Sequence, residues 1–170
     1  MVIFIVTEMM FFLGFISAFT IVKSTAETWP PLDQPRLPWE ATLFNSLALL
    51  ASGFFIFMAN RHFRSERHDQ AKKFFFTSLA LGTFFVIYQG YEWSQLLQYG
   101  LTMRSSQYGS FFYLIIGAHA LHALVALFLM ARLALRAKGR TLPAESFFTV
   151  QAFWYFVVGI WPVLYVLVYL

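Results

Sequence analysis

The sequence predicts an all-α, polytopic membrane protein that forms a single domain over residues 1–170, a bundle of five transmembrane helices. Its 170 residues are 59% hydrophobic and 12% charged, whereas a soluble domain carries about 25% charged residues. Five apolar runs cover roughly residues 1–22, 41–60, 74–97, 109–133 and 147–170. Each approaches or exceeds the roughly 20 residues that cross a bilayer core.

The first run opens at Met1, with neither a basic region nor a small-residue cleavage site ahead of it. We therefore expect a retained helix and not a cleaved signal peptide. The connection that follows, residues 23–40, contains four prolines and the triplet Trp29-Pro30-Pro31. Because proline fixes φ and has no backbone donor, an extended connection is predicted here, with Trp29 at the membrane interface.

The second run carries a seam of polar and small residues, Asn45, Ser46, Ser52 and Gly53, at helical spacing. Small residues let helices approach closely in a membrane, and polar ones form hydrogen bonds between helices. We favour helix packing for Asn45, Ser52 and Gly53 over a role in binding.

The third run ends near Gln89, Glu92 and Trp93, with Tyr88 and Tyr91 close by in the sequence. Aromatic residues at this depth are typical of the interfacial belt of membrane proteins. We assign Gln89, Glu92 and Trp93 to the interface. Two interpretations of Glu92 stay open, a solvated interfacial carboxylate and an internal functional group.

The fourth run places His119 and His122 near mid-membrane, where the i, i+3 spacing projects both from one face of a helix. Gly117 and three alanines surround them, which predicts close packing against a neighbour and an internal position. Two imidazoles on one helix face cannot bind both sides of a haem. A metal site would need further ligands, and Glu8 is the plausible additional ligand. We therefore assign neither a haem nor a metal ion to this chain.

Glu8 lies about 10 Å from the start of the first helix at 1.5 Å rise per residue. The fourth helix runs in the opposite direction, so His122 falls at a similar depth, and we expect Glu8 near His122. A carboxylate facing lipid costs several kcal/mol, which favours an internal cavity. The alternative is a side chain that reaches the headgroup region.

Lys and Arg number 2, 5, 1 and 4 in the four successive connections. Cytoplasmic connections hold the excess of cations, which predicts the N-terminus inside and the C-terminus outside. The basic residues thus mark topology, and we expect no nucleic-acid partner. Zero cysteines exclude disulfides, thiolate clusters and covalently attached haem. No nucleophile–base set or phosphate loop indicates catalysis by this chain.

Six motifs follow one another along the chain: Glu8-Met9-Met10-Phe11-Phe12, Trp29-Pro30-Pro31, Asn45-Ser46 with Ala51-Ser52-Gly53, Gln89-Gly90-Tyr91-Glu92-Trp93, Tyr108-Gly109-Ser110-Phe111-Phe112, and Gly117 with His119 and His122. In this order they resemble subunit III of the haem–copper oxidases, cytochrome c oxidase subunit III in particular, in its five-helix form. The last helix departs from the family pattern. Phe148, Tyr155 and Val158 stand where the family has glutamate, histidine and aspartate, and Pro162 predicts a kink or break.

The resemblance implies an accessory subunit in respiratory electron transport, in the bacterial plasma membrane. It implies no bound cofactor in this chain, haem and copper in the catalytic subunit I beside it, and phospholipid between the helices. Glu8, His119 and His122 would line the lipid cleft and support proton uptake. A subunit of a quinol oxidase, a nitric oxide reductase or another respiratory complex is the alternative. A small transporter is a more distant one.

Overall fold

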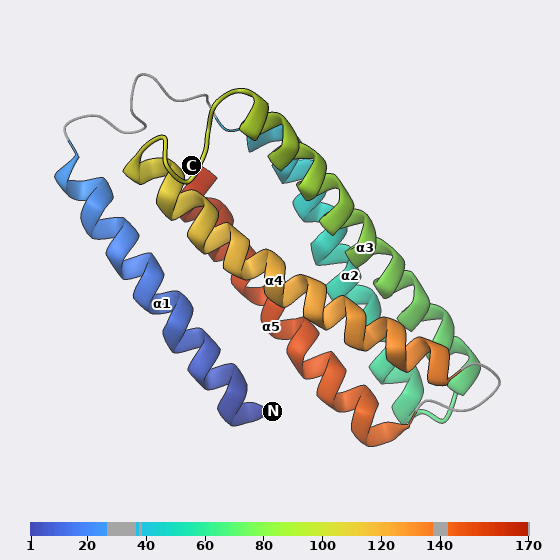
Figure 1. The fold of residues 1–170 in the computed structure, drawn as a ribbon. Coiled ribbons are helices and arrows are strands. Elements are labelled where there is room, and N and C mark those ends of the chain that lie inside the picture. Colours follow the sequence, from blue (N-terminus) through green and yellow to red (C-terminus); the bar gives the residue numbers. More distant parts are fainter. Residues whose placement is uncertain (27–36, 38, 138–142, 170) are drawn as a thin grey trace.

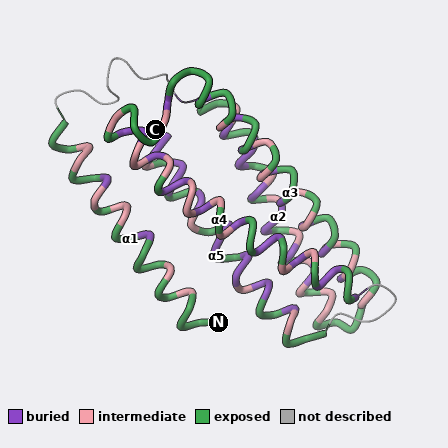
Figure 2. The backbone as a smooth tube through the Cα atoms, in the orientation of Figure 1, coloured by how far each residue is buried: buried purple, intermediate pink, exposed green. Residues whose placement is uncertain are grey.

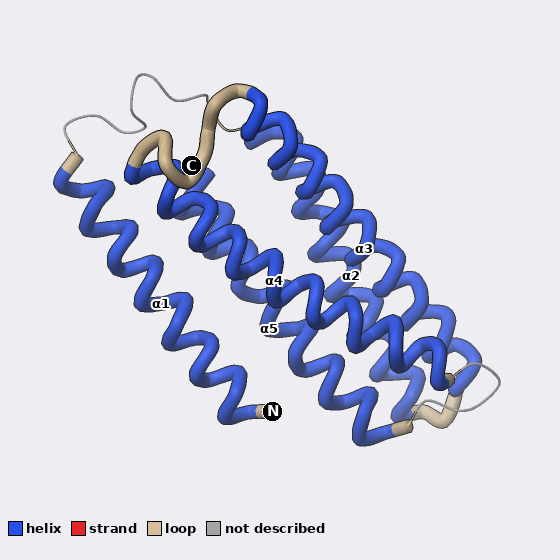
Figure 3. The backbone as a smooth tube through the Cα atoms, in the orientation of Figure 1, coloured by secondary structure: helices blue, strands red, loops and turns tan. Residues whose placement is uncertain are grey.

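The computed structural model describes residues 1–26, 37, 39–137 and 143–169. They form five helices, α1 (Val2–Thr25), α2 (Trp39–Arg64), α3 (His68–Gln98), α4 (Gln107–Arg136) and α5 (Ala144–Tyr169), and the described chain contains no strand (Figure 3). All five are long and apolar enough to cross a membrane, which confirms the predicted fold class. Trp29 and the proline-rich triplet fall outside the described residues.

The helices form three adjacent groups, with α4 and α5 in the middle (Figure 1). On one side α2 and α3 pack along each other as a hairpin. On the other side α1 contacts α4 and α5, and within the described chain it touches neither α2 nor α3. Figure 2 shows the consequence, since α1 is mostly exposed and α5 is buried along much of its length. In a bilayer, most of the exposed surface of α1 is apolar and suited to lipid.

Two helices are longer than predicted, because α2 and α3 extend through most of the polar stretch 61–73. The connection shrinks to residues 65–67, where Glu66 has a φ of 58°. Arg, Lys, Glu and Gln are good helix formers, and backbone hydrogen bonds within a helix satisfy polar groups wherever the helix leaves the bilayer. The charged residues therefore did not mark the ends of these two helices.

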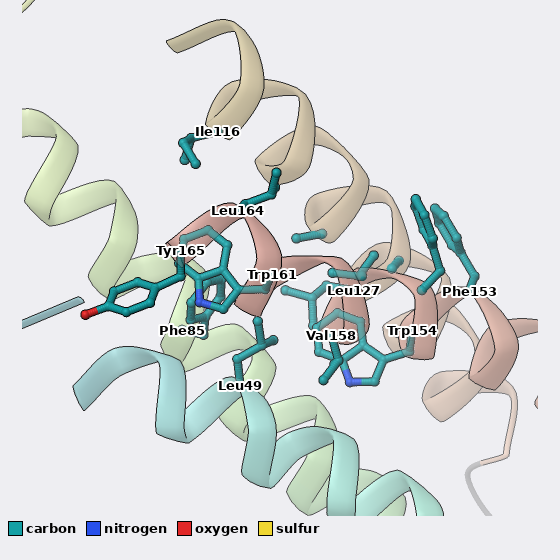
Figure 4. Close-up of a cluster of buried hydrophobic side chains, with 14 of the residues drawn as sticks. Leu49, Phe85, Ile116, Leu127, Phe153, Trp154, Val158, Trp161, Leu164 and Tyr165 are labelled. Atoms are coloured by element: carbon teal, nitrogen blue, oxygen red, sulfur yellow. The ribbon is translucent and has the colours of Figure 1, made fainter. Parts of the chain in front are cut away.

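Two tryptophans of α5 form the centre of the core. Trp154 is fully buried and Trp161 is almost so, and Figure 4 shows both rings directed toward α2 and α3, with Leu49, Phe85 and Val158 around them. Each of these large aromatic rings fills space between three helices that smaller side chains would leave open. Pro162 follows directly, yet α5 continues to Tyr169, so the predicted break is absent.

The glycines that pack are only partly those predicted. A Cβ atom on Gly53 would lie 2.9 Å from Cγ1 of Val158, and one on Gly82 would lie 2.5 Å from Cζ2 of Trp154. Gly53 therefore allows the close approach predicted for it. Among the described residues, nothing lies within 4 Å of a Cβ position on Gly117. Within this chain, Gly82 and not Gly117 therefore allows close packing.

Candidate functional site

Glu8 of α1 and His122 of α4 meet between the two helices. His122 Nε2 lies 2.9 Å from Glu8 Oε2, and His122 Nδ1 lies 2.7 Å from the carbonyl oxygen of Ala118. Because a carbonyl can only accept, Nδ1–H is the donor in the second bond. One proton is then shared in the first bond, on His122 as an ion pair or on Glu8 as a neutral pair, and the pair has no net charge in either form.

The pair lies among aromatic rings. The centroid of the Phe12 ring is 5.4 Å from that of His122, and those of Phe153 and Phe156 are 6.3 and 6.0 Å away. The side chains of His122 and Glu8 keep 14% and 21% exposure, so both remain partly accessible beside α1. The predicted proximity of Glu8 and His122 is confirmed, while their role in lipid binding or proton uptake stays a prediction.

His119 lies in a different environment, although it is one turn away on the same helix. It is 1% exposed, and its ring stacks on Trp161 with centroids 4.9 Å apart. Neither ring nitrogen has a hydrogen-bond partner within the described residues. His119 also lines a cavity of about 140 Å³ between α3, α4 and α5, with Gln89 and Trp93. The structure therefore joins Glu8 to His122 and directs His119 into the core.

A second polar group lies toward the end of the bundle where α2 begins and α3 ends. Glu92 is 4% exposed, and its Oε2 accepts hydrogen bonds from Thr42 Oγ1 at 2.9 Å and from Gln89 Nε2 at 3.1 Å. Gln89 Nε2 also lies 3.2 Å from Tyr169 Oη. Both side chains are buried between helices, so Glu92 is not a solvated carboxylate. The interfacial depth of Gln89, Glu92 and Trp93 stays a prediction, as does a functional role for Glu92.

Asn45 belongs to this group through its amide, which donates to Gln89 Oε1 at 3.4 Å and to the carbonyl oxygen of Phe85 at 3.1 Å. Sequence reasoning missed Thr42 and Tyr169. Thr42 could have been found, because it precedes Asn45 by three residues and so shares its helix face. Tyr169 could not have been found, because it lies 77 positions from Glu92 along the chain and only tertiary packing brings the two together.

The polar seam of α2 ties three helices together. Ser52 Oγ donates to the carbonyl oxygen of Ser78 on α3 at 2.8 Å, and it accepts from Trp154 Nε1 on α5 at 2.9 Å. Ser46 Oγ accepts from Trp161 Nε1 at 2.7 Å. Hydrogen bonds between membrane helices contribute on the order of 1 kcal/mol each. These contacts confirm the packing interpretation of the seam.

Across the described ranges, no three His, Cys, Asp or Glu side chains gather into a group that could hold a metal ion. The family model for cytochrome c oxidase subunit III matches residues 1–170, the whole chain. The chain belongs to the cytochrome c oxidase subunit III family. Its role as subunit III of a haem–copper oxidase, inferred above from six motifs, is thereby confirmed.

Relatives of this subunit III occur in bacteria and in insects. It is 35% identical over 175 residues to a probable cytochrome c oxidase subunit 3 of Mycobacterium leprae, covering 99% of this chain and 84% of that one. The cytochrome c oxidase subunit 3 of Synechocystis is 33% identical over 99% of this chain and 73% of its own. The cytochrome c oxidase subunit 3 of Anopheles gambiae is 33% identical, over 99% of this chain and 67% of its own length.

The departures in the last helix of this subunit III are accommodated within the fold. Val158 packs against Gly53. The Tyr155 hydroxyl accepts a hydrogen bond from Gln151 Nε2 at 2.8 Å, and the Phe148 ring lies 5.8 Å from the guanidinium carbon of Arg64. Each position thus has a packing partner suited to its residue type.

Proposed function

We propose that this subunit III is an accessory, non-catalytic component of a bacterial terminal oxidase. It lies in the plasma membrane beside the catalytic subunit, which holds the haem and copper. The names of the bacterial relatives support cytochrome c as the electron donor of the complex. No step of electron transfer is assigned to the chain itself.

The Glu8–His122 contact carries this proposal. A carboxylate within an apolar span is costly unless it is paired, and here the partner comes from another helix at 2.9 Å. The partly exposed pair lies at the side of the bundle where α1 packs. A phospholipid headgroup or the surface of a partner subunit can reach it there. We infer that Glu8 and His122 hold phospholipid, and that His119 supports the site from the core.

The same pair supports a part in proton uptake. Its shared proton can lie on Glu8 or on His122 without leaving a net charge in the membrane. A group of this kind can exchange a proton with a neighbouring carboxylate or water at low electrostatic cost. We infer that it helps the catalytic subunit to sustain proton supply during turnover.

Purification of the tagged chain from its native membrane tests the proposal. We expect the haem absorption spectrum of an oxidase in the purified sample, together with copper and a larger catalytic subunit. Recovery of the chain alone, free of haem and copper under mild detergent, would contradict an accessory role. Solute transport by the isolated chain in liposomes would support the transporter instead.

A further inference from the structure

The cavity of about 140 Å³ between α3, α4 and α5 has few polar groups in its wall. Gln89 and Trp93 line it from α3, His119 lines it from α4, and Trp161 lines it from α5. These four are the hydrogen-bonding side chains of the lining, and the rest of the lining is apolar. Any polar occupant of the cavity therefore depends on this small set of residues.

His119 contributes an imidazole whose two nitrogens are both unpartnered within the described residues. The residue is 1% exposed, so bulk solvent does not satisfy them. A neutral imidazole has one N–H donor and one nitrogen acceptor. Buried polar groups in native proteins nearly always have a partner, either another protein group or an ordered water. The cavity beside His119 is the place from which such a partner can come.

Packing alone does not explain a histidine at this position. The imidazole stacks on Trp161 with centroids 4.9 Å apart and an interplanar angle of 30°, but stacking uses the face of the ring and leaves the nitrogens at its edge. A phenylalanine ring would stack in the same way. An imidazole that loses all its hydrogen bonds on burial destabilises a fold, so the nitrogens of His119 need a separate explanation.

The size of the cavity and the number of its polar partners suit water. At roughly 30 Å³ per molecule, a few waters fit. A wholly apolar cavity of this size stays dry, because a buried water needs about two to four polar partners. His119 supplies one donor and one acceptor. Gln89 Oε1 accepts from Asn45 Nδ2 at 3.4 Å, and a carbonyl oxygen can accept a second hydrogen bond, which makes three partners.

Gln89 also connects the cavity to the buried carboxyl group of Glu92. Its Nε2 donates to Glu92 Oε2 at 3.1 Å. The other carboxyl oxygen, Glu92 Oε1, has no hydrogen-bond partner in the described chain, and neither has Asn45 Oδ1. Unpartnered polar atoms thus lie on both sides of Gln89, toward His119 and toward Glu92.

We propose that this cavity is an internal water site, and that its water joins His119 to the polar group around Glu92 in one hydrogen-bonded network. The network links the middle of α4 to the outer part of α3, and it includes a carboxyl group other than Glu8. The inference goes beyond the function proposed above, and it does not require lipid at Glu8.

A cryo-electron-microscopy map of the assembled oxidase, at a resolution that shows ordered water, tests the site directly. We expect compact density within hydrogen-bond distance of a ring nitrogen of His119. Ala120→Leu should abolish this density, because Ala120 lines the cavity and a larger side chain fills it. Ala131→Leu is the matched control. Ala131 is half-buried on the same helix, as Ala120 is, and it lines a groove whose side chains are all apolar.

The variant His119→Phe gives a second test, because it keeps an aromatic ring against Trp161 and removes both nitrogens. If water bridges His119 to Gln89, the variant leaves that water with too few partners, and the melting temperature of subunit III within the complex falls. In a dry cavity the same change removes an unsatisfied polar group, and the melting temperature rises. The two hypotheses therefore predict shifts of opposite sign.

A map without density beside His119, or an unchanged or raised melting temperature in His119→Phe, would overturn the proposal. So would elongated density that continues into the bilayer, which would indicate a lipophilic molecule in the cavity. If Ala120→Leu fails to assemble, the wild-type map and His119→Phe still decide. Failure here leaves an assembled oxidase with a dry or differently filled cavity, whereas failure of the proposed function leaves no oxidase to assay.

Discussion

The carboxylate of Glu8 lies in a helix that is otherwise apolar over most of its length, and its partner comes from a residue 114 positions away. The cost of placing this pair among apolar side chains depends less on which partner holds the shared proton than on the pair having no net charge. Removal of either partner leaves the other with an unsatisfied polar group among the rings of Phe12, Phe153 and Phe156. Leaving a buried polar group without its partner lowers the stability of the fold by about 1–3 kcal/mol.

Glu8→Ala should leave assembly and the initial rate of electron transfer largely unchanged and should shorten the lifetime of activity during turnover. The reason is that His122 loses the partner that holds it and shares its proton. Oxygen consumption followed over sustained turnover measures this. Glu66→Gln, in the exposed turn between α2 and α3, is the control that should behave as wild type, and an unchanged lifetime in Glu8→Ala would count against the proposed role.

The helices α1 and α5 have similar apolar composition but differ in how much of each is buried in the bundle. In α1, Phe12 and Phe19 are the buried residues, whereas α5 buries both tryptophans and packs against α1, α2 and α4. Periodicity does not separate the two, because lipid and protein interior are both apolar and either suits a hydrophobic side chain. Which helix becomes central is decided by the fit of Trp154 and Trp161 against α2 and α3.

Gly82→Ala should destabilise the bundle, and Gly117→Ala should not. The added methyl on residue 82 would meet the Trp154 ring at 2.5 Å, whereas the space at residue 117 is open. Overpacking of a tight core costs about 1–3 kcal/mol. Thermal unfolding of the purified complex measures the difference, with Gly117→Ala as the matched control, and equal melting temperatures for the two variants would refute the assignment.

At the scale of the whole molecule, the basic residues divide between the two ends of the bundle. The turn between α2 and α3, the end of α4 and the start of α5 share one end with the N-terminus (Figure 1). Lys23 lies at the last turn of α1, at the other end. This arrangement agrees with the alternation that the cation counts require, while the side on which each end lies stays a prediction.

Introduced cysteines test that orientation, because the chain has no native cysteine. Ser65→Cys lies in the turn between α2 and α3, and Met103→Cys lies in the connection from α3 to α4, where Met103 is 54% exposed. A membrane-impermeant maleimide should label Met103→Cys on intact cells and Ser65→Cys only after the membrane is opened. The reverse pattern would invert the predicted topology.

Much of the site could be predicted because depth in a membrane follows from position in a helix. A rise of about 1.5 Å per residue places Glu8 and His122 at one level, and the low dielectric of the bilayer requires that a carboxylate find a partner. The same reasoning could not separate His119 from His122. Residues at i and i+3 share a face within about 60°, and that difference directs one imidazole to α1 and the other to Trp161.

By itself the sequence determined the five spans, the family and the pairing of Glu8 with the fourth helix, since each depends on local composition, motif order or depth. Tertiary structure alone decided that Glu92 is buried, that Gly82 and not Gly117 allows close packing within the chain, and that His119 stacks on Trp161 while His122 meets Glu8. The physical reason is that burial depends on which helix faces are in contact. Apolar spans of nearly equal hydrophobicity do not encode that choice in their periodicity.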